Sequence, residues 1–188
     1  LHQDTRRRPG IVLIGLSLIT ITCTILAALS KENGALLPLY ALIISFFLGR
    51  PPVLPNKHWH LWSAIFLWLP SLAILCFLAF RLPYTETTLF IRDFTGFERL
   101  LTEAKILWQY LFNAFLPIDT AWFGPFHDNY PISRSFFAPL TLISVIAWIT
   151  VIALALLLRK KTPVFTFAVF WFLGGHIIES TVLPLDLY

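Results

Sequence analysis

The sequence predicts an all-α fold, a polytopic transmembrane helix bundle with about five spans and one amphipathic helix at the outer membrane interface. Three observations predict it. Hydrophobic residues make up 57% of the 188 residues and charged residues 13%, far from the balance of a soluble domain. Long apolar stretches recur, and basic residues gather in the segments on one side of them. We therefore expect a lipid bilayer around the chain.

Five apolar stretches are candidates for membrane spans. A helix that crosses the hydrocarbon core needs roughly 17 to 25 apolar residues, and residues 10–30, 59–80 and 136–158 meet this length. Residues 35–49 and 163–178 are shorter. Each of these two carries a proline near its start, where a helix tolerates it, so we expect both to cross. The first stretch is longer than the core of a secretory signal and is predicted to be a permanent span.

The distribution of charge predicts the orientation of the spans. With the N-terminus in the cytoplasm, the cytoplasmic segments hold Arg6–Arg8, Arg50 and Lys57, and Arg159–Lys161, while nine of the ten acidic residues lie on the other face. Lysine and arginine near helix ends bias a segment toward the cytoplasm. Residues 81–135 then form an outer segment. We expect no nucleic-acid partner, because orientation explains the net charge of +4 and the sequence has no phosphate-binding glycine loop.

Within the outer segment, residues 97–115 predict an amphipathic helix. Its polar face includes Glu98 and Lys105, and burying both in lipid would cost several kcal/mol in all. We therefore expect this helix to lie along the outer interface, with its apolar face toward lipid or the other spans. The apolar face holds Phe97, Leu101, Ala104, Trp108, Leu111 and Phe115, and the polar face also holds Thr102, Gln109 and Asn113.

Three polar clusters are expected at the outer surface. The first is the proline-bounded stretch FGPFHDNYPISR, which contains His127, Asp128, Asn129, Tyr130 and Arg134. Its composition also fits a simple tight turn, in which aspartate and asparagine cap backbone groups.

The other two clusters lie at the ends of predicted spans. SKENG contains Lys31 and Glu32, and it also fits a plain helical hairpin in which Lys31 reaches the interface and Gly34 makes the turn. GGHIIES contains His176 and Glu179, after two glycines that allow backbones to approach closely. Ionisable residues at a membrane boundary are often functional, so three clusters on one face indicate a site.

The clusters also carry a resemblance to a known family. LSKENGALLPLY resembles the SKE-type motif of the transmembrane and tetratricopeptide-repeat proteins, and RLLTEAKILWQYLFNAFLP, FGPFHDNYPISRS and FWFLGGHIIESTVLPLDLY look like bacterial relatives of them. The resemblance covers the chain from about residue 11 onward. That family belongs to the GT-C superfamily of multi-span glycosyltransferases. The resemblance implies transfer of a sugar from a polyprenyl-phosphate carrier to a protein or glycan acceptor on the extracytoplasmic face, the periplasmic side of a bacterial inner membrane.

The implied reaction gives the clusters a chemistry. Sugar transfer from a lipid phosphate needs a carboxylate that accepts the acceptor's proton and cations that hold the departing phosphate. Asp128 and Glu32 are the candidate carboxylates, with His127 as an orienting partner, and we expect the clusters to face one another across one outer cavity. A lone His–Asp pair is a poor metal signature, so we expect no metal ion or other cofactor. The candidate substrate-binding residues are Lys31, Arg134, Asn129, Tyr130, His176 and Glu179.

Two features of the family are missing from the sequence. GT-C enzymes carry a catalytic acidic residue in the first outer loop, a position that only SKEN could fill here, and no repeat of about 34 residues appears. We therefore interpret residues 1–188 as a transmembrane-domain fragment of a larger protein, catalytically incomplete on its own. Three alternatives stay open: a non-catalytic membrane scaffold, a transporter subunit, and a polymerase or ligase for lipid-linked polysaccharide.

Overall fold

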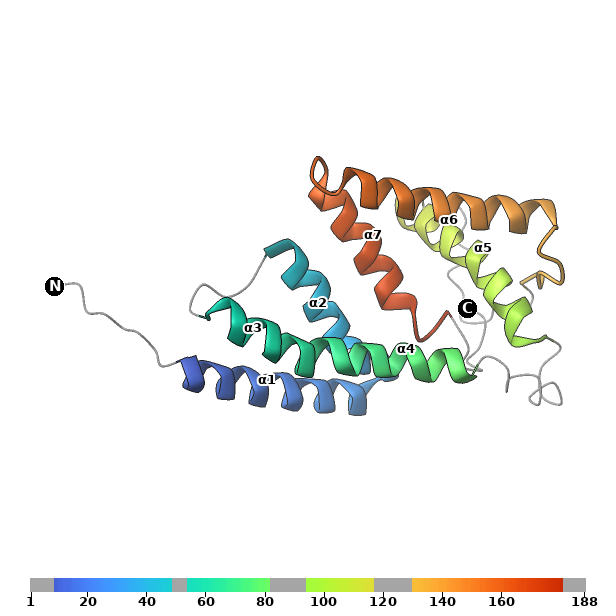
Figure 1. The fold of residues 1–188 in the computed structure, drawn as a ribbon. Helices are drawn as coiled ribbons and strands as arrows, with labels where there is room; N and C mark the ends of the chain where they lie inside the picture. Colours follow the sequence, from blue (N-terminus) through green and yellow to red (C-terminus); the bar gives the residue numbers. More distant parts are fainter. Residues whose placement is uncertain (1–8, 49–53, 82–93, 117–129, 181–188) are drawn as a thin grey trace. The chain divides into compact units, whose positions relative to one another are not determined.

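The computed structural model of the protein describes residues 9–48, 54–81, 94–116 and 130–180. Within these ranges every regular element is a helix, as Figure 1 shows. The predicted all-α class is therefore confirmed for the described part of the chain.

The chain divides into two compact units. The first unit contains Leu1–Phe77 and Pro163–Gly175, and the second contains Leu78–Thr162 and His176–Tyr188. The division passes through the ends of two helices. The last residue of α7 (Pro163–His176) and the part of α4 (Leu69–Arg81) that follows Phe77 belong to the second unit.

The first unit begins with α1 (Pro9–Ser30), a helix of 22 residues. Proline is tolerated at its start because the N–H groups of the first turn have no partner inside the helix. Large apolar side chains such as Ile14 (63% exposed) and Leu18 (61% exposed) face outward. A helix with exposed apolar side chains suits hydrocarbon surroundings better than water.

A tight connection joins the first two long elements. The 3-10 helix η1 (Glu32–Leu36) leads from α1 into α2 (Leu37–Leu48). Gly34 lies in this connection against the main chain of Ala27, at a place where a Cβ atom would overlap the backbone. The hairpin therefore requires glycine at this position.

A single long apolar helix follows in the first unit. Helices α3 (Asn56–Ser63) and α4 (Leu69–Arg81) continue into each other through a π-helical turn, η2 (Ala64–Trp68). Pro70 lies just after this turn and has no N–H to donate to the carbonyl four residues earlier. A π-turn next to a proline that interrupts the main-chain hydrogen bonds of a helix is a common local adjustment.

Aromatic side chains hold the helices of the first unit together. Trp62 of α3 donates a hydrogen bond of 2.9 Å from Nε1 to Ser17 Oγ of α1. Helix α7 packs on α2, where the ring centroids of Tyr40 and Trp171 lie 4.6 Å apart.

Two glycines shape the contact between α7 and α2. A Cβ atom on Gly174 would lie 3.0 Å from the Ile43 side chain, and one on Gly175 would lie 2.8 Å from the Tyr40 hydroxyl. We expected these glycines to let backbones approach closely, but the groups nearest to them are side chains of α2.

The second unit is built on α5 (Gly96–Phe115) and α6 (Pro139–Leu158), which pack against each other (Figure 1). α5 begins with a capping box. The Glu98 N–H donates to Thr95 Oγ1 at 3.2 Å, and the Thr95 N–H donates to Glu98 Oε2 at 2.8 Å. These reciprocal bonds satisfy two N–H groups and fix where the helix begins.

Three helices in the described ranges are long and apolar enough to cross a membrane, and they match three predicted spans. The other two predicted spans form shorter apolar helices, so the total of five spans stays a prediction. The helix predicted at residues 97–115 is confirmed as α5, while its position at the interface stays a prediction. The three candidate spans are Pro9–Ser30, Asn56–Phe80 and Pro139–Leu158, and the shorter helices are Glu32–Phe47 and Pro163–His176.

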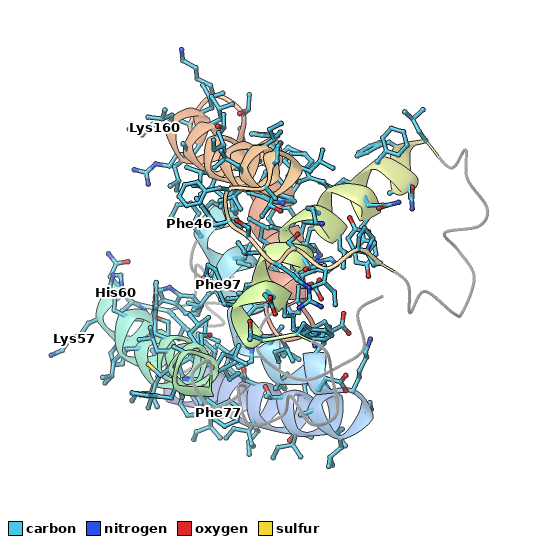
Figure 2. All side chains as sticks on the ribbon, turned by 90° about the vertical axis from the view of Figure 1, so that its right-hand side faces the viewer. Phe46, Lys57, His60, Phe77, Phe97 and Lys160 are labelled. Carbon is cyan, nitrogen blue, oxygen red and sulfur yellow. The ribbon has the colours of Figure 1, made fainter. Side chains whose placement is uncertain are left out.

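The structure describes some of the basic residues from which we predicted the orientation. Lys57, at the start of α3, and Lys160, just after α6, are both exposed (Figure 2). Exposure at a helix end suits a charged side chain at a membrane boundary. The orientation itself stays a prediction.

Candidate functional site

One face of α5 is both buried and polar. Arg99 is 2% exposed, Thr102 0% and Glu103 5%. These residues lie three and four positions apart, on the side of the helix that also carries the buried Ile106 and Leu107. A buried arginine and glutamate are rare unless they are paired, so this face is the strongest candidate for a functional site.

The predicted faces of α5 agree with the structure only in part. Phe97 is 56% exposed, which fits its predicted contact with lipid, and Leu101 is buried, which fits packing against other helices. Thr102 belongs to the predicted polar face and yet is fully buried. It can be buried because it has hydrogen-bond partners inside the unit.

Arg99 joins α5 to the turn at residues 176–180. Its Nη2 donates a hydrogen bond of 2.8 Å to the main-chain oxygen of Glu179 and lies 3.5 Å from Glu103 Oε1, one helical turn along α5. The 176–180 turn is itself closed by a bond of 2.8 Å from the Ser180 N–H to the His176 oxygen. The buried guanidinium thus has a carboxylate on its own helix and a carbonyl on the turn.

Burial dominates the acid–base chemistry of Glu103. Removal from water raises the pKa of its carboxyl group from 4.5 to about 7; the Arg99 charge and a hydrogen bond with Ser180 lower it, and the Glu179 charge raises it. At neutral pH Glu103 is therefore divided between acid and carboxylate. A carboxyl group in this range can accept a proton and return it.

Lys105 anchors the segment that begins at Tyr130. Its Nζ donates a hydrogen bond of 3.0 Å to the Pro131 oxygen and lies 5.2 Å from the centre of the Tyr130 ring. Burial lowers the pKa of Lys105. Burial raises the pKa of Tyr130, and the charge of Glu103 raises it further, so Tyr130 lies within electrostatic reach of that carboxyl group. We call the following six residues the α5 cluster: Arg99, Glu103, Lys105, Tyr130, Glu179 and Ser180.

A chain of hydroxyl groups fastens the same segment to both helices. The Ser133 N–H donates to Thr102 Oγ1 at 2.9 Å, and Thr141 Oγ1 donates to Ser133 Oγ at 3.0 Å. All three residues are at most 4% exposed. Arg134 lies 3.8 Å from Glu98, but its side chain is 65% exposed, so this ion pair contributes little to stability.

Four of the predicted substrate-binding residues contact α5. They come from two separate segments of the chain, and the structure brings both segments to one helix. The contacts are those of Tyr130 with Lys105, Arg134 with Glu98, Glu179 with Arg99, and His176 with Tyr110, whose ring centroids are 5.9 Å apart.

The remaining predicted site residues belong to the first unit or lie outside the described residues. Lys31 and Glu32 belong to the first unit and are exposed, at the beginning of η1. Asp128, His127 and Asn129 lie outside the described residues. The predicted meeting of the three polar clusters across one cavity stays a prediction, and so do the catalytic roles assigned to these residues.

Arg99 and Glu103 were not among the predicted site residues, although the sequence carries a signal for them. Successive residues of an α-helix are about 100° apart, so the four charges of its first half cannot share one face. Glu98 and Lys105 lie together, whereas Arg99 and Glu103 form an i,i+4 pair on a separate face. The sequence signal for the buried pair was therefore two opposite charges four residues apart, Arg99 and Glu103, bordered by apolar residues.

The first unit contains an open cavity of about 340 Å³ between α1, α2, η2 and α4. Its lining is apolar apart from Thr20 and Thr24, and the Thr24 hydroxyl already donates to the Thr20 oxygen at 2.7 Å. No ionisable side chain lines this cavity. It therefore offers no group for acid–base chemistry, in contrast to the α5 cluster.

The described residues include three helices long and apolar enough to cross a membrane, and another helix, α5, carries the buried ion pair of Arg99 and Glu103. Among the residues that the structure describes, no group of three or more histidine, cysteine, aspartate or glutamate side chains could hold a metal ion. Comparisons with protein-family models, curated protein sequences and solved structures gave no significant match. The chemistry of the site is therefore the basis for a functional proposal.

Proposed function

We propose that this chain is part of an integral-membrane glycosyltransferase of the GT-C type. The enzyme moves a sugar from a polyprenyl-phosphate carrier to a protein or glycan acceptor on the extracytoplasmic face, the periplasmic side of a bacterial inner membrane. The observation that carries the proposal is Glu103, a buried carboxyl group with a pKa of about 7 beside Arg99. The resemblance of the polar motifs to that family adds to this observation.

Glu103 suits the role of proton acceptor. In the transfer, an acceptor oxygen or nitrogen bonds to the anomeric carbon, the bond from that carbon to the phosphate oxygen breaks, and the phosphate leaves with the electron pair. The acceptor's proton passes to a carboxylate. A carboxyl group whose pKa lies near neutrality is both partly ionised and basic enough for this step. Asp128 and Glu32 stay as further candidates for the same role.

Two cationic side chains at the segment that begins at Tyr130 could bind the departing phosphate. Lys105 contacts the segment at Tyr130 and Pro131, and Arg134 extends from that segment with its side chain 65% exposed. Positive charge at these positions would stabilise the negative charge that develops on the phosphate. Arg99 is buried against Glu103 and Glu179, so it acts as a positioning residue for the Glu103 carboxyl group.

The test is a Glu103→Gln variant of the full-length protein. Glutamine keeps the size of the side chain and cannot take up the proton, so transfer of sugar to the acceptor should fall by about 100-fold or more. Glu98→Gln is the matched control, because Glu98 lies on the same helix and glutamine can also complete a capping box. Transfer at the wild-type rate by Glu103→Gln, with normal membrane insertion, would contradict the proposal.

A second candidate function is a non-catalytic membrane scaffold. One observation favours it: polar groups of the α5 cluster bond to one another and to main-chain atoms, as Arg99 does with the Glu179 oxygen and Lys105 with the Pro131 oxygen. Such bonds are what a purely structural cluster needs. In a scaffold, Glu103→Gln would change the stability of the protein and leave transfer by the intact enzyme complex unchanged.

A further inference from the structure

The 176–180 turn covers the ion pair of α5. Arg99 donates to the main-chain oxygen of Glu179 at 2.8 Å, and Ser180, which is 9% exposed, forms a hydrogen bond with the Glu103 carboxyl group. Glu103 is 5% exposed and Arg99 2%. The turn thus makes one contact with each partner of a buried pair of charges.

Ionisable groups from three elements face this pair or lie near it. On α5 the neighbour of Glu103 is Arg99, and on the turn it is Glu179. On the segment that begins at residue 130 it is Tyr130. His176, at the beginning of the turn, contacts the ring of Tyr110 on α5. Two carboxyl groups, one guanidinium and one phenol therefore share the region that the turn covers.

We propose that docking of the 176–180 turn on α5 is coupled to protonation of Glu103: the neutral acid holds the turn in place, and the carboxylate favours its release. The Glu103 carboxyl group is buried beside Arg99, and the charge of Glu179 on the turn opposes its ionisation. When Glu103 is neutral, its burial beneath the turn does not require a charge to be removed from water, and Arg99 keeps its hydrogen bond to the Glu179 oxygen. When Glu103 is charged, exposure to water relieves both its desolvation and its repulsion by Glu179.

The direction of this coupling follows from proton linkage. With the turn docked, Glu103 has a pKa of about 7, against an ordinary value of 4.5. With the turn released, water reaches the carboxyl group and its pKa falls toward the ordinary value. The docked state therefore binds the proton more tightly, and the ratio of released to docked molecules rises between these two pKa values by up to about two orders of magnitude.

Release of the turn would also expose the carboxyl group in its charged form. This coupling depends only on contacts within the second unit, so it stands whether or not the protein transfers a sugar. If the proposed transfer occurs, the turn controls when an acceptor reaches Glu103. The inference thus goes beyond the proposed function and adds a means of regulation.

The experiment measures how fast a cysteine on the turn reacts with a maleimide, in the full chain in lipid nanodiscs. Cys23 and Cys76, which are exposed and free, are first replaced by serine. Ile178→Cys then reports on the turn, where the native side chain is 5% exposed. Lys160→Cys in a second sample gives the rate of an exposed thiol at each pH, and the ratio of the two rates removes the thiol's own titration.

The rate ratio should rise about tenfold or more between roughly pH 5 and pH 8. With Glu103→Gln added, the ratio should stay low at every pH, because the side chain is always neutral. A ratio that does not change with pH in the protein that keeps Glu103 overturns the proposal, and this comparison holds even if Glu103→Gln folds poorly.

A His176→Gln variant separates the effect of Glu103 from that of the imidazole at the beginning of the turn. His176 is an ionisable group on the turn, so it is the competing source of a pH effect. The rise should persist in His176→Gln if Glu103 controls the turn. Loss of the rise in His176→Gln, with the rise retained in Glu103→Gln, overturns the proposal and assigns the effect to the histidine.

Discussion

Trp108 of α5 and Trp148 of α6 hold each other's helix by reciprocal hydrogen bonds. Their rings stack with centroids 4.4 Å apart and an angle of 29° between planes. Trp108 Nε1 donates to the Ser144 oxygen at 3.2 Å, and Trp148 Nε1 donates to the Ala104 oxygen at 3.0 Å. Each indole thus contacts the other ring and the other main chain. This double contact sets how α5 meets α6, and with it which face of α5 turns inward.

Replacing Trp148 should loosen this helix pair. Trp148→Phe keeps an aromatic ring and loses the donor, so it should cost about 1 kcal/mol of unfolding free energy. Trp148→Ala also removes the packing and should cost about 3 to 5 kcal/mol. Denaturation in detergent checks both values. Trp68→Phe is the control, because Trp68 is 55% exposed, and an equal loss there would contradict the assigned role of Trp148.

Thr102 should matter through its hydroxyl group. Thr102→Val has nearly the same shape and leaves the buried Ser133 N–H without its acceptor, which should cost about 1 to 3 kcal/mol. Thr102→Ser keeps the oxygen and should cost less. Unfolding by denaturant compares the two variants. Equal stability of Thr102→Val and the wild type would show that the hydroxyl chain does not hold the segment at Ser133.

Gly34→Ala should disrupt the hairpin of the first unit. The added methyl group would overlap the main chain of Ala27, and overpacking of this kind costs about 1 to 3 kcal/mol. Gly15→Ala is the matched control, because a Cβ at Gly15 meets nothing within 4 Å and alanine favours a helix. Thermal denaturation should therefore show a lower midpoint for Gly34→Ala only.

The stability of the second unit should depend on pH through Glu103. Its pKa in the folded protein, about 7, lies above the ordinary value of 4.5, so the folded state binds the proton more tightly. The stability contributed by this proton is complete below the ordinary value and is lost as pH rises through about 7, on the order of 3 kcal/mol in all. Unfolding measured from pH 4 to about pH 8 should show this loss, and Glu103→Gln should abolish it.

The orientation of the spans can be tested by labelling from outside the cell. With the N-terminus in the cytoplasm, Asp128→Cys should react with a membrane-impermeant reagent and Lys160→Cys should not, because basic segments remain inside. Both variants are made without the native cysteines Cys23 and Cys76. Equal labelling at the two positions would rule out the predicted orientation and the extracytoplasmic placement of the site.

The sequence was sufficient to locate the long helices. Apolar length alone decides whether a segment can form a membrane-crossing helix, and α1 and α6 begin and end within three residues of their predicted bounds. For α5, the apolar periodicity placed the helix within one residue of its observed start, Gly96. The capping box formed by Thr95 and Glu98 explains why it begins there.

The sequence was not sufficient to identify the buried charges. Hydrophobic periodicity assigns a charged residue to the outside by default, but Arg99 and Glu103 are buried because they pair with each other and with the 176–180 turn. That turn is about 80 residues away along the chain. Its contact with α5 depends on tertiary structure, which no local pattern of residues encodes. The same holds for Thr102, whose partner is Ser133.

The capping box at Thr95 and Glu98 has a consequence for how insertions and deletions would act. Because it fixes the first residue of α5, it also fixes the rotational phase of every residue that follows. Inserting one residue between Glu98, where the box ends, and Arg99 would turn the rest of the helix by about 100°. Arg99 and Glu103 would then point away from the 176–180 turn, and Trp108 would lose Trp148. Point substitutions in this stretch act locally, whereas a change of length would dismantle both contacts at once.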